Sequence, residues 1–388
     1  MDVVISGIGQ SAVGRRLERS GLGLTVDATL EALADAGLEV PDIDGIATYP
    51  GFRPDMPAFS PVSSLDLKEA LGFRLDWYSG GLEGPAQLGA LINAYAAIKA
   101  GLARHVVCFR TVKEGTGGAA WKQSSLPSTE RTRVSGEFQW ILPFNAISAT
   151  NWLSLYAQRH FHLYGTTREQ MAQISLNARR NGALNPKALY REAITLDDYL
   201  SSRMISTPLC LFDCDTPSDA STVIILSSAD AARDLKSTPV HIDSVGSAIH
   251  GKASWDQADM PSMAAFDAGR MLWSRTDWKP ADVDVALLYD GFTFLTLTWL
   301  EAMGFCGVGE SGAFVDGGAR IARDGVLPLN PHGGQLAAGR THGFGFVHEA
   351  VTQLRGLGGD RQVAGDVKLA AVGAGGGPIG GALLLARR

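Results

Sequence analysis

The stretch NPHGGQLAAGRTHGFGF, residues 330–346, is the most informative part of this chain. It holds five glycines and two histidines within 17 residues, and apolar residues at helical spacing follow it up to Leu354. The pattern predicts a loop that leads directly into a helix. Glycine lets a backbone approach a ligand closely, and the free N–H groups of a first helical turn favour a negative oxygen. The stretch is therefore either a simple turn or the wall of a site for a carbonyl or phosphate oxygen.

The composition of the 388 residues is that of a globular protein, with 45% hydrophobic and 19% charged residues. A net charge of −6 without charged blocks argues against nucleic acid or an anionic membrane surface as the main partner. The cysteines contain no C-x-x-C pair, so we expect no zinc and no disulfide, and a cytoplasmic protein with reduced thiols. They are Cys108, Cys210, Cys214 and Cys306. Neither a signal peptide nor an apolar run long enough to span a membrane is present in the sequence.

One order of predicted elements occurs twice, about 240 residues apart. Each copy has a buried strand, a helix, a turn with proline and aspartate, and a second buried strand, followed by a glycine-containing loop, another helix and a third strand. The strands are predicted at residues 3–8, 45–49, 105–109, 240–245, 285–289 and 367–372, and the helices at 25–36, 82–101, 265–273 and 345–354. We therefore expect an α/β protein with an N-terminal half, 1–230, and a C-terminal half, 239–388, related by a pseudo-twofold axis.

An insertion in the first half is predicted at about residues 113–203. It carries helical patterns at 152–163 and 168–181 between glycine and proline turns. Long inserted segments often shape the mouth of a binding site, so we expect a cap over a cleft where the loops of both halves converge.

Several motifs resemble those of the thiolase superfamily. YDGF at 289–292 stands where thiolases have N-E-A-F or H-D-C-F, the loop at 330–343 resembles N-x-x-G-G-x-x-x-x-G-H-P-x-G, and GAGGG at 373–377 resembles C-x-G-G-G. LEAMGFC at 300–306 is closest to the sterol-carrier-type branch. The resemblance covers nearly the whole chain. It implies the thiolase fold, with five layers in the order α-β-α-β-α.

The catalytic positions that this resemblance implies have changed. Counting back 17 residues from Gly101 places Gly84 at the position of the nucleophilic cysteine. Arg340 replaces the histidine of G-H-P, Gly373 replaces the second cysteine, and Tyr289 replaces the Asn or His. Thiolase chemistry needs a thiolate to carry the acyl group, so we do not expect a thiolase.

Within the superfamily, the chain resembles the thiolase-like aldolases of bacterial steroid side-chain degradation, once called lipid-transfer proteins. The shared segments are VALLYD at 285–290, GFCG at 304–307, PHGGQL at 331–336, NPKA at 185–188 and PLCLFDC at 208–214. The resemblance implies retro-aldol cleavage of a bulky β-hydroxyacyl-CoA to a ketone and a shorter acyl-CoA. It also implies a homodimer that binds a small zinc-ribbon and OB-fold partner as a heterotetramer. No metal, and no cofactor beyond the coenzyme A of the substrate, is expected in this chain.

A retro-aldol reaction needs a base near the β-hydroxyl, donors around the thioester oxygen and an acid near Cα, but no nucleophile. Two tyrosines are implicated in the resembling family; the first maps to Tyr289 and the second to Arg340. Tyr289 is either the base, if a cation such as Arg340 lowers its pKa from about 10, or a strand-end aromatic with a satisfied hydroxyl. Arg340 could instead hold the enolate oxygen. His342 is the predicted acid or base, or else a helix cap.

Five further residues complete the predicted site. Asp290 follows Tyr289 and either takes part in the chemistry or holds loops together. Main-chain N–H groups of Gly84, Gly375 and Gly376 are expected to form an oxyanion hole. His332 either contacts the substrate or only braces its loop.

Two other functions stay open from the sequence. One is a non-catalytic subunit, or an acyl-CoA-binding scaffold, of thiolase fold that has lost its cysteines. The other is a thiolase that uses a remaining cysteine, although Cys108 lies in a predicted buried strand and Cys306 follows a helix that leads away from the site. Polar groups at Tyr289, Arg340 and His342 favour an enzyme, because a scaffold has no need of them.

Overall fold

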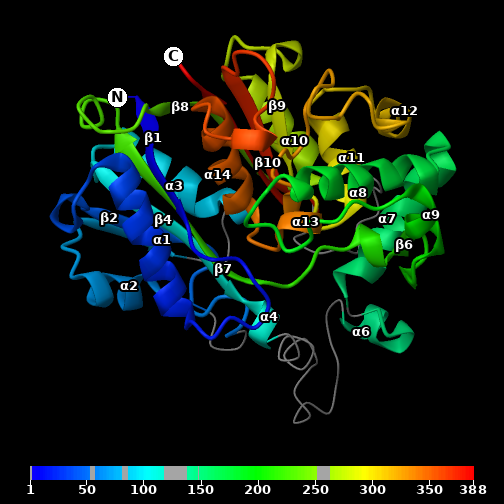
Figure 1. Ribbon diagram of the computed structural model, residues 1–388, viewed down its shortest axis with the longest axis horizontal. Coiled ribbons are helices and arrows are strands. Elements are labelled where there is room, and N and C mark those ends of the chain that lie inside the picture. Colours follow the sequence, from blue (N-terminus) through cyan, green and yellow to red (C-terminus); the bar gives the residue numbers. More distant parts are fainter. Residues whose placement is uncertain (1, 53–56, 81–85, 118–137, 147, 251–262) are drawn as a thin grey trace.

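The computed structural model describes all residues except 1, 53–56, 81–85, 118–137, 147 and 251–262 (Figure 1). Within the described part, one large sheet is built from strands of both halves. The first half contributes β1 (Val3–Gln10), β2 (Gly45–Thr48), β3 (Trp77–Gly80), β4 (His105–Lys113) and β7 (Asp219–Ser228), and the second half contributes β8 (Val240–Ile249), β9 (Val285–Leu288), β10 (Leu369–Gly375) and β11 (Ile379–Ala386). All six predicted strands are present, with bounds that differ from the prediction by a few residues.

The strand order shows the predicted duplication. It runs β3-β2-β4-β7-β1-β8-β11-β10-β9, and β1 pairs with β8 at the centre. In the first half, β1 pairs antiparallel with β7, β7 pairs antiparallel with β4, and β4 pairs in parallel with β2. In the second half, β8 pairs antiparallel with β11, β11 pairs antiparallel with β10, and β10 pairs in parallel with β9. The first half has the additional edge strand β3, which pairs in parallel with β2.

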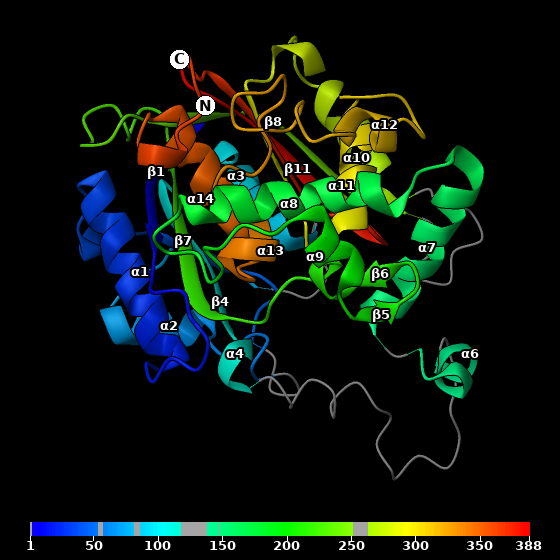
Figure 2. The same cartoon turned by 45° about the vertical axis from the view of Figure 1, so that its right-hand side comes forward.

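Helices cover both faces of each half (Figures 1 and 2). Alternate side chains of the first-half strands point to α1 (Gly21–Ala36) and to α3 (Gly89–Lys99), so these two helices lie on opposite faces. In the second half, α10 (Ala264–Trp273) packs on β8 and β11, whereas α14 (Gly343–Leu354) packs on β9 and β10 and also touches β1 and β7. The turn before α3 likewise touches β10 and β11. The helix α14 and the turn before α3 therefore lie between the two halves, as the predicted thiolase-like fold requires.

The insertion forms a helical flank beside the second half (Figure 2). The two predicted helices are confirmed as α7 (Ala149–Tyr164) and α8 (Arg168–Ala183), and the hydroxyls of Ser148 and Thr167 cap their first turns. The helix α8 packs on α11 (Thr293–Ala302) and on α13 (Gly334–Ala338), which ties the insertion to the loop at 330–346. The other short elements are α2 (Ser64–Leu71), α4 (Glu114–Gly117), α6 (Phe138–Ile141), α9 (Leu196–Ser201), α12 (Ser311–Val315), β5 (Met204–Ser206) and β6 (Leu209–Cys210).

Two predicted elements differ from the structure in ways that matter for the site. The helix expected at 82–101 begins later, because residues 86–88 form a 3-10 turn and α3 starts at Gly89. The strand expected at 105–109 continues to Lys113 and carries Arg110 into the sheet. In the described part of the chain, every helix is too short or too polar to cross a membrane.

Candidate active site

The loop at 330–346 is fixed to the end of β9 by side-chain amides. Asn330 accepts from the backbone N–H of Leu288 at 2.9 Å and donates to its carbonyl at 2.8 Å, as a neighbouring strand would. Further along the loop, the N–H of Gln335 donates to Asp290 Oδ1 at 2.7 Å, and Gln335 Oε1 accepts from the N–H of His342 at 2.8 Å. The strand end that carries Tyr289 and the start of α14 are therefore held in one rigid unit.

A cavity of about 320 Å³ opens beside this unit. It brings together three of the predicted residues, Tyr289, Arg340 and His342. The other lining residues are Phe59, Gln87, Glu114, Ser148, Ala149, Thr150, Cys214, Asp215 and Phe292. Four of these, Glu114 and the residues 148–150, belong to the predicted insertion. A second cavity of about 180 Å³ shares Tyr289 with the first and reaches Gly375 through mostly apolar walls.

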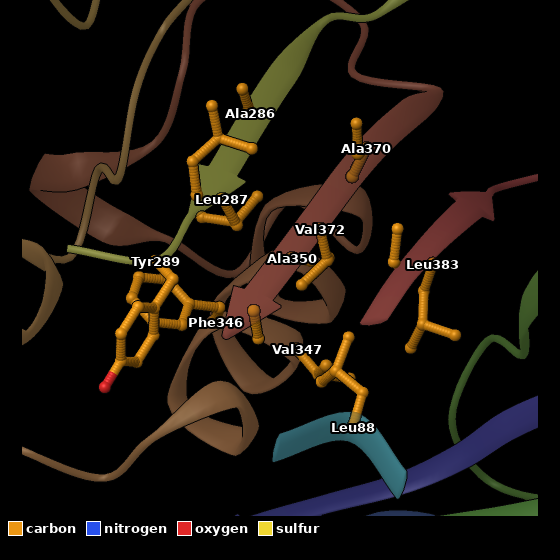
Figure 3. Close-up of a cluster of buried hydrophobic side chains, with 14 of the residues drawn as sticks. Leu88, Ala286, Leu287, Tyr289, Phe346, Val347, Ala350, Ala370, Val372 and Leu383 are labelled. Atoms are coloured by element: carbon orange, nitrogen blue, oxygen red, sulfur yellow. The ribbon is translucent and has the colours of Figure 1, made fainter. Parts of the chain in front are cut away.

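Tyr289 stands at the boundary between apolar core and cavity. Its ring meets Phe346 edge-on at 6.1 Å between centroids, and the hydroxyl points away from the apolar cluster (Figure 3). Burial raises the pKa of Tyr289 well above its usual range, and the charge of Asp215 adds to the rise; Gln335, Gln87 and Arg340 oppose it. Arg340 lowers the pKa of Tyr289 less than burial raises it, so the condition under which Tyr289 would be the base is not met. At neutral pH Tyr289 is a hydroxyl that can donate a proton or a hydrogen bond.

Arg340 is committed to two carboxylates. Its Nε and Nη2 donate to the two oxygens of Asp215 at 2.9 and 2.5 Å, and its Nη1 donates to Glu114 Oε1 at 3.2 Å. Both carboxylate side chains are at least 96% buried. Each of the three guanidinium nitrogens makes one of these contacts, which leaves one N–H on Nη1 and one on Nη2. Arg340 therefore pairs with the two carboxylates, and its role toward an enolate oxygen stays a prediction.

His342 is held as a neutral donor. Its Nδ1 accepts from Arg110 Nε at 3.1 Å, and the Arg110 guanidinium lies 4.4 Å from the centre of the Phe59 ring. Burial lowers the pKa of His342 far below its usual range, and the charges of Arg110 and Arg340 lower it further. An arginine Nε always carries hydrogen, so Nδ1 of His342 is the acceptor and its proton is on Nε2. The geometry gives His342 a donor role at Nε2 and does not support the expected proton exchange as an acid or base.

Asp290 binds the loop and lines neither of these two cavities. It is fully buried, and burial raises its pKa to about 8. The hydrogen bond from the backbone N–H of Gln335 opposes this rise. Gly334 has a φ of +58°, and a Cβ at this position would overlap the Asp290 carboxylate. Of the two open alternatives for Asp290, its contacts support the structural one.

The predicted oxyanion hole is only partly supported. The N–H of Gly376 already donates to the carbonyl of Ile379 at 2.9 Å, so it is not free for a ligand. Gly375 lines the smaller cavity, and its carbonyl accepts from Trp299 Nε1 at 3.0 Å. Gly84 lies outside the described residues.

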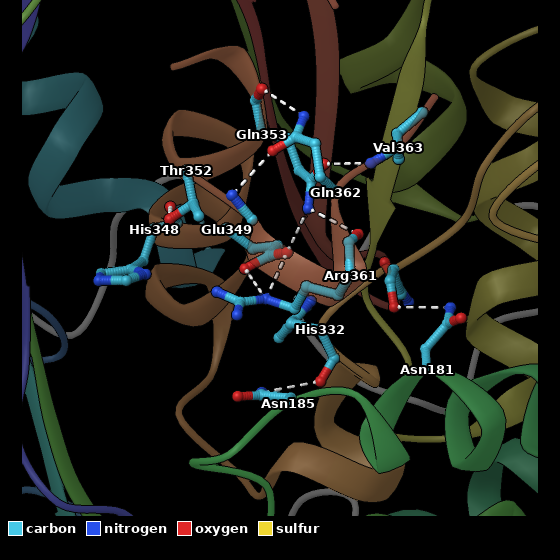
Figure 4. Close-up of polar contacts among 12 residues, drawn as sticks. Asn181, Asn185, His332, His348, Glu349, Thr352, Gln353, Arg361, Gln362 and Val363 are labelled. Carbon is cyan, nitrogen blue, oxygen red and sulfur yellow. Dashed lines mark hydrogen bonds and ion pairs between the residues drawn. The ribbon is translucent and has the colours of Figure 1, made fainter. Parts of the chain in front are cut away.

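His332 lines neither cavity that contains Tyr289, and its ring meets the Phe346 ring edge-on at 5.5 Å between centroids. It lines a separate cavity of about 440 Å³, together with residues such as His348 and Arg361. Figure 4 shows its carbonyl accepting from Asn185, at 2.9 Å, and a nearby ion pair between Glu349 and Arg361. Burial lowers the pKa of His332 to about 3. His332 is not at the predicted substrate site, and the structure supports the loop-bracing alternative.

The position of the second thiolase cysteine has no room for a side chain. A Cβ added to Gly373 would lie 2.6 Å from Cε3 of Trp299, a fully buried side chain of α11. The indole therefore occupies the space that a cysteine would need.

One cysteine does reach the cavity, which the sequence did not indicate. Cys214 lines it, whereas Cys108, Cys210 and Cys306 line neither cavity. Burial raises the pKa of Cys214 to about 12, and the charges of Asp213 and Asp215 add to the rise. The thiol is therefore protonated at neutral pH and is not an activated nucleophile.

Sequence reasoning also missed Arg110, Glu114, Asp215 and Gln335. Arg110 offered a signal, since a charged residue within an otherwise apolar strand has to find a buried partner. The others are polar residues in loops or at helix ends, and their sequence neighbours do not reveal that they meet Arg340 or His342.

The fold and the cavity together define a thiolase-fold protein whose cavity is lined by polar donors and, among the described residues, by a cysteine that stays protonated. Residues 246–384 match the family model described as thiolase C-terminal domain-like. A steroid side-chain-cleaving aldolase of Thermomonospora curvata is 35% identical over 99% of this chain and 98% of that protein. A 17-hydroxy-3-oxo-4-pregnene-20-carboxyl-CoA lyase of Mycobacterium tuberculosis is 35% identical over 91% of each. The solved structure titled Ltp2-ChsH2(DUF35) aldolase superposes with a TM-score of 0.86 at 32% identity, over 100% of this chain and 98% of that one.

This chain belongs to the thiolase superfamily, in the branch of thiolase-fold aldolases that contains these relatives. It is an enzyme of the lyase class.

Proposed function

We propose that this protein cleaves a bulky β-hydroxyacyl-CoA by a retro-aldol reaction to a ketone and a shorter acyl-CoA. The observation that carries the proposal is the placement of two neutral donors, the Tyr289 hydroxyl and His342, around a cavity whose cysteine is not ionised. In this reaction the electrons of the Cα–Cβ bond move to the thioester oxygen, and fixed donors stabilise that charge. His342 Nε2 donates to the oxygen, and Tyr289 gives its proton to Cα.

The proposed substrate has a bulky apolar acyl group. The two relatives are named for a steroid side chain and a pregnene carboxyl-CoA. In this chain, the smaller cavity beside Tyr289 has apolar walls that suit such a group. They come from Leu153, Phe292, Leu295, Pro378 and Ile379. A smaller aryl or alkyl group would fit the same chemistry, so a panel of acyl groups is needed to choose between them.

We further propose a homodimer and a small partner of the zinc-ribbon and OB-fold kind. The name of the solved relative pairs Ltp2 with ChsH2(DUF35), and this chain matches that structure over its whole length. The partner, the cytoplasmic location and the need for no metal or cofactor beyond coenzyme A stay predictions.

The activity test uses the chain purified together with the proposed zinc-ribbon and OB-fold partner. The complex is incubated with a branched β-hydroxyacyl-CoA in the absence of free coenzyme A, and mass spectrometry detects the ketone and the shortened acyl-CoA. Tyr289→Phe should lower turnover by about 10²- to 10³-fold, the usual cost of one catalytic donor, while acyl-CoA still binds. Tyr164→Phe, at a partly exposed tyrosine of α7, is the matched control and should remain active.

Other results would support the alternatives. A complex that binds acyl-CoA but converts no β-hydroxy or β-keto substrate would be a scaffold. Products that form only with added coenzyme A, and are lost in Cys214→Ser, would identify a thiolase.

A further inference from the structure

We propose that Glu114 is the base that accepts the proton of the substrate β-hydroxyl. The inference rests on the proposed retro-aldol function and supplies the base that this reaction needs. His342 accepts from Arg110 at Nδ1 and so donates at Nε2, and the buried Tyr289 keeps its proton, so neither residue is that base. Three acidic side chains lie near the cavity, and their contacts decide among them.

Glu114 follows directly on β4, as the first residue of α4, and its side chain is 96% buried. Its Oε1 accepts from Arg340, whereas its Oε2 has no hydrogen-bond partner among the described residues. Asp215 has both oxygens bound by Arg340. Oδ2 of Asp290 also lacks a partner, but Asp290 lines neither cavity at the site. Oε2 of Glu114 is thus a buried carboxylate oxygen of a cavity-lining residue that has no hydrogen-bond partner among the described residues, and a substrate hydroxyl that enters this corner of the cavity would supply one.

Two cations and one anion face Glu114 in the site. Arg340 comes from the loop before α14 and Arg110 from β4, and both guanidiniums interact electrostatically with Glu114. Asp215, from the segment before β7, is the opposing negative charge, and the fork of Arg340 neutralises it. Arg340 also fixes Oε1, so the free oxygen Oε2 has a defined direction, which a base requires.

With Glu114 as the base, the site both takes up the proton that the β-hydroxyl loses and supplies the proton that Cα gains. Glu114 Oε2 takes the β-hydroxyl proton as the Cβ–O bond becomes a carbonyl and the Cα–Cβ bond breaks. The electron pair moves through Cα to the thioester oxygen, where His342 Nε2 donates a hydrogen bond. Tyr289 protonates Cα and regains a proton from Glu114 through the cavity. No oxidant, metal or nucleophile is consumed.

The test compares two substitutions at Glu114 in the complex with its partner. Glu114→Gln keeps an oxygen for Arg340 but cannot take a proton, so kcat should fall by about 10²- to 10⁴-fold with little change in KM. The wild-type rate should fall at low pH, where the base is protonated, and the residual rate of the variant should lack this acidic limb. Glu114→Ala should regain activity with added formate, which an ion pair of purely structural value would not cause.

Glu349→Gln is the matched control. Glu349 is also buried and paired with an arginine, Arg361, but it lines the separate cavity beside His332, so kcat should stay near the wild-type value. An active wild type together with a Glu114→Gln variant within about threefold of it, at an unchanged pH profile, would overturn the role of Glu114 and leave the proposed function intact. A wild-type complex that cleaves no β-hydroxyacyl-CoA would overturn both.

Discussion

At the scale of single residues, the site depends on balanced charges in a buried place. Two guanidiniums, of Arg110 and Arg340, face two carboxylates, of Glu114 and Asp215. Asp215 and Arg340 shift the pKa of Tyr289 in opposite directions, so burial decides that the hydroxyl stays protonated. Burial lowers the pKa of His342, and the charges of Arg110 and Arg340 lower it further, so His342 stays neutral. Tyr289 and His342 therefore both remain uncharged hydrogen-bond donors in this buried site.

The charge balance makes Arg340 important for stability. Arg340→Met leaves two buried carboxylates without a partner and should lower the free energy of unfolding by about 3 kcal/mol at pH 7. Burial already raises the pKa of Asp215 and Arg340 opposes that rise, so removing Arg340 should raise the pKa further. The unpaired carboxylates then take protons as the pH falls, and the loss should shrink toward pH 5. Urea unfolding at both pH values measures this.

An exposed ion pair provides the control for that experiment. Arg19 bonds to Asp27 with 56% and 44% of the two side chains exposed, so Arg19→Met should leave the free energy of unfolding nearly unchanged at either pH. Equal losses in the two variants would show that the contacts of Arg340 add nothing to stability.

At the scale of elements, the packing of β10 against α11 leaves no room for a cysteine side chain at position 373. Gly373 on β10 and Gly376 just beyond it both lie against the indole of Trp299, and its Nε1 donates to the carbonyl between them at Gly375. The helix α11 is buried along its whole length and cannot shift away from the strand without disturbing α10 and α8. A cysteine at 373 therefore conflicts with the packing of an entire helix.

Gly373→Cys should restore no thiolase activity and should destabilise the protein by about 1–3 kcal/mol, the usual cost of overpacking a core.

A double-mutant cycle tests whether the indole is the obstacle. The free-energy cost of Gly373→Ala should shrink when Trp299→Phe is also present, because the smaller ring leaves room for the new Cβ. A double-mutant cycle by urea unfolding checks this. Additive costs would mean that the indole is not the obstacle.

Elements were easier to predict from the sequence than the contacts of the site. The strands and helices carry regular apolar spacing, and their repetition about 240 residues later supported the assignment of both copies. The bounds failed where that spacing fails, as at Arg110, which continues β4 although it is charged. Tyr289, Arg340 and His342 were found through sequence motifs. Their roles were not, because these depend on Glu114, Asp215 and Arg110, which are distant in the sequence.

At the scale of the whole molecule, the site is a product of both halves. Glu114 and Arg110 come from the first half, whereas Tyr289, Arg340 and His342 come from the second. The central strands pair at two residue positions, and the ion pair of Arg355 with Asp35 joins the halves between α14 and α1. Neither half holds a complete set of donors and acceptors, so the chemistry requires the intact chain.

The two ends of the large sheet differ, and this asymmetry supports the predicted homodimer. The outer edge of β9 is covered, since Leu329 bridges to Ala286 and Asn330 bonds to Leu288. The strand β3 at the other end pairs with β2, and no strand in the described part pairs with its outer edge. Tyr78 on β3 is 75% exposed beside a cavity of about 560 Å³. Uncovered strand edges tend to pair with another chain.

We therefore expect two copies to pair through β3 and to extend the sheet across a twofold axis. Tyr78→Glu places a charge in that contact and should convert a dimer into a species near the chain mass of 41.1 kDa in light scattering. Val326→Glu is the matched control, because Val326 is 80% exposed but belongs to the second half, and it should leave the dimer intact. A wild-type chain that is monomeric at high concentration, or a dimer that survives Tyr78→Glu, would contradict pairing through β3. Since Tyr78 lines neither cavity at the site, the monomer should still bind acyl-CoA, which separates assembly from catalysis.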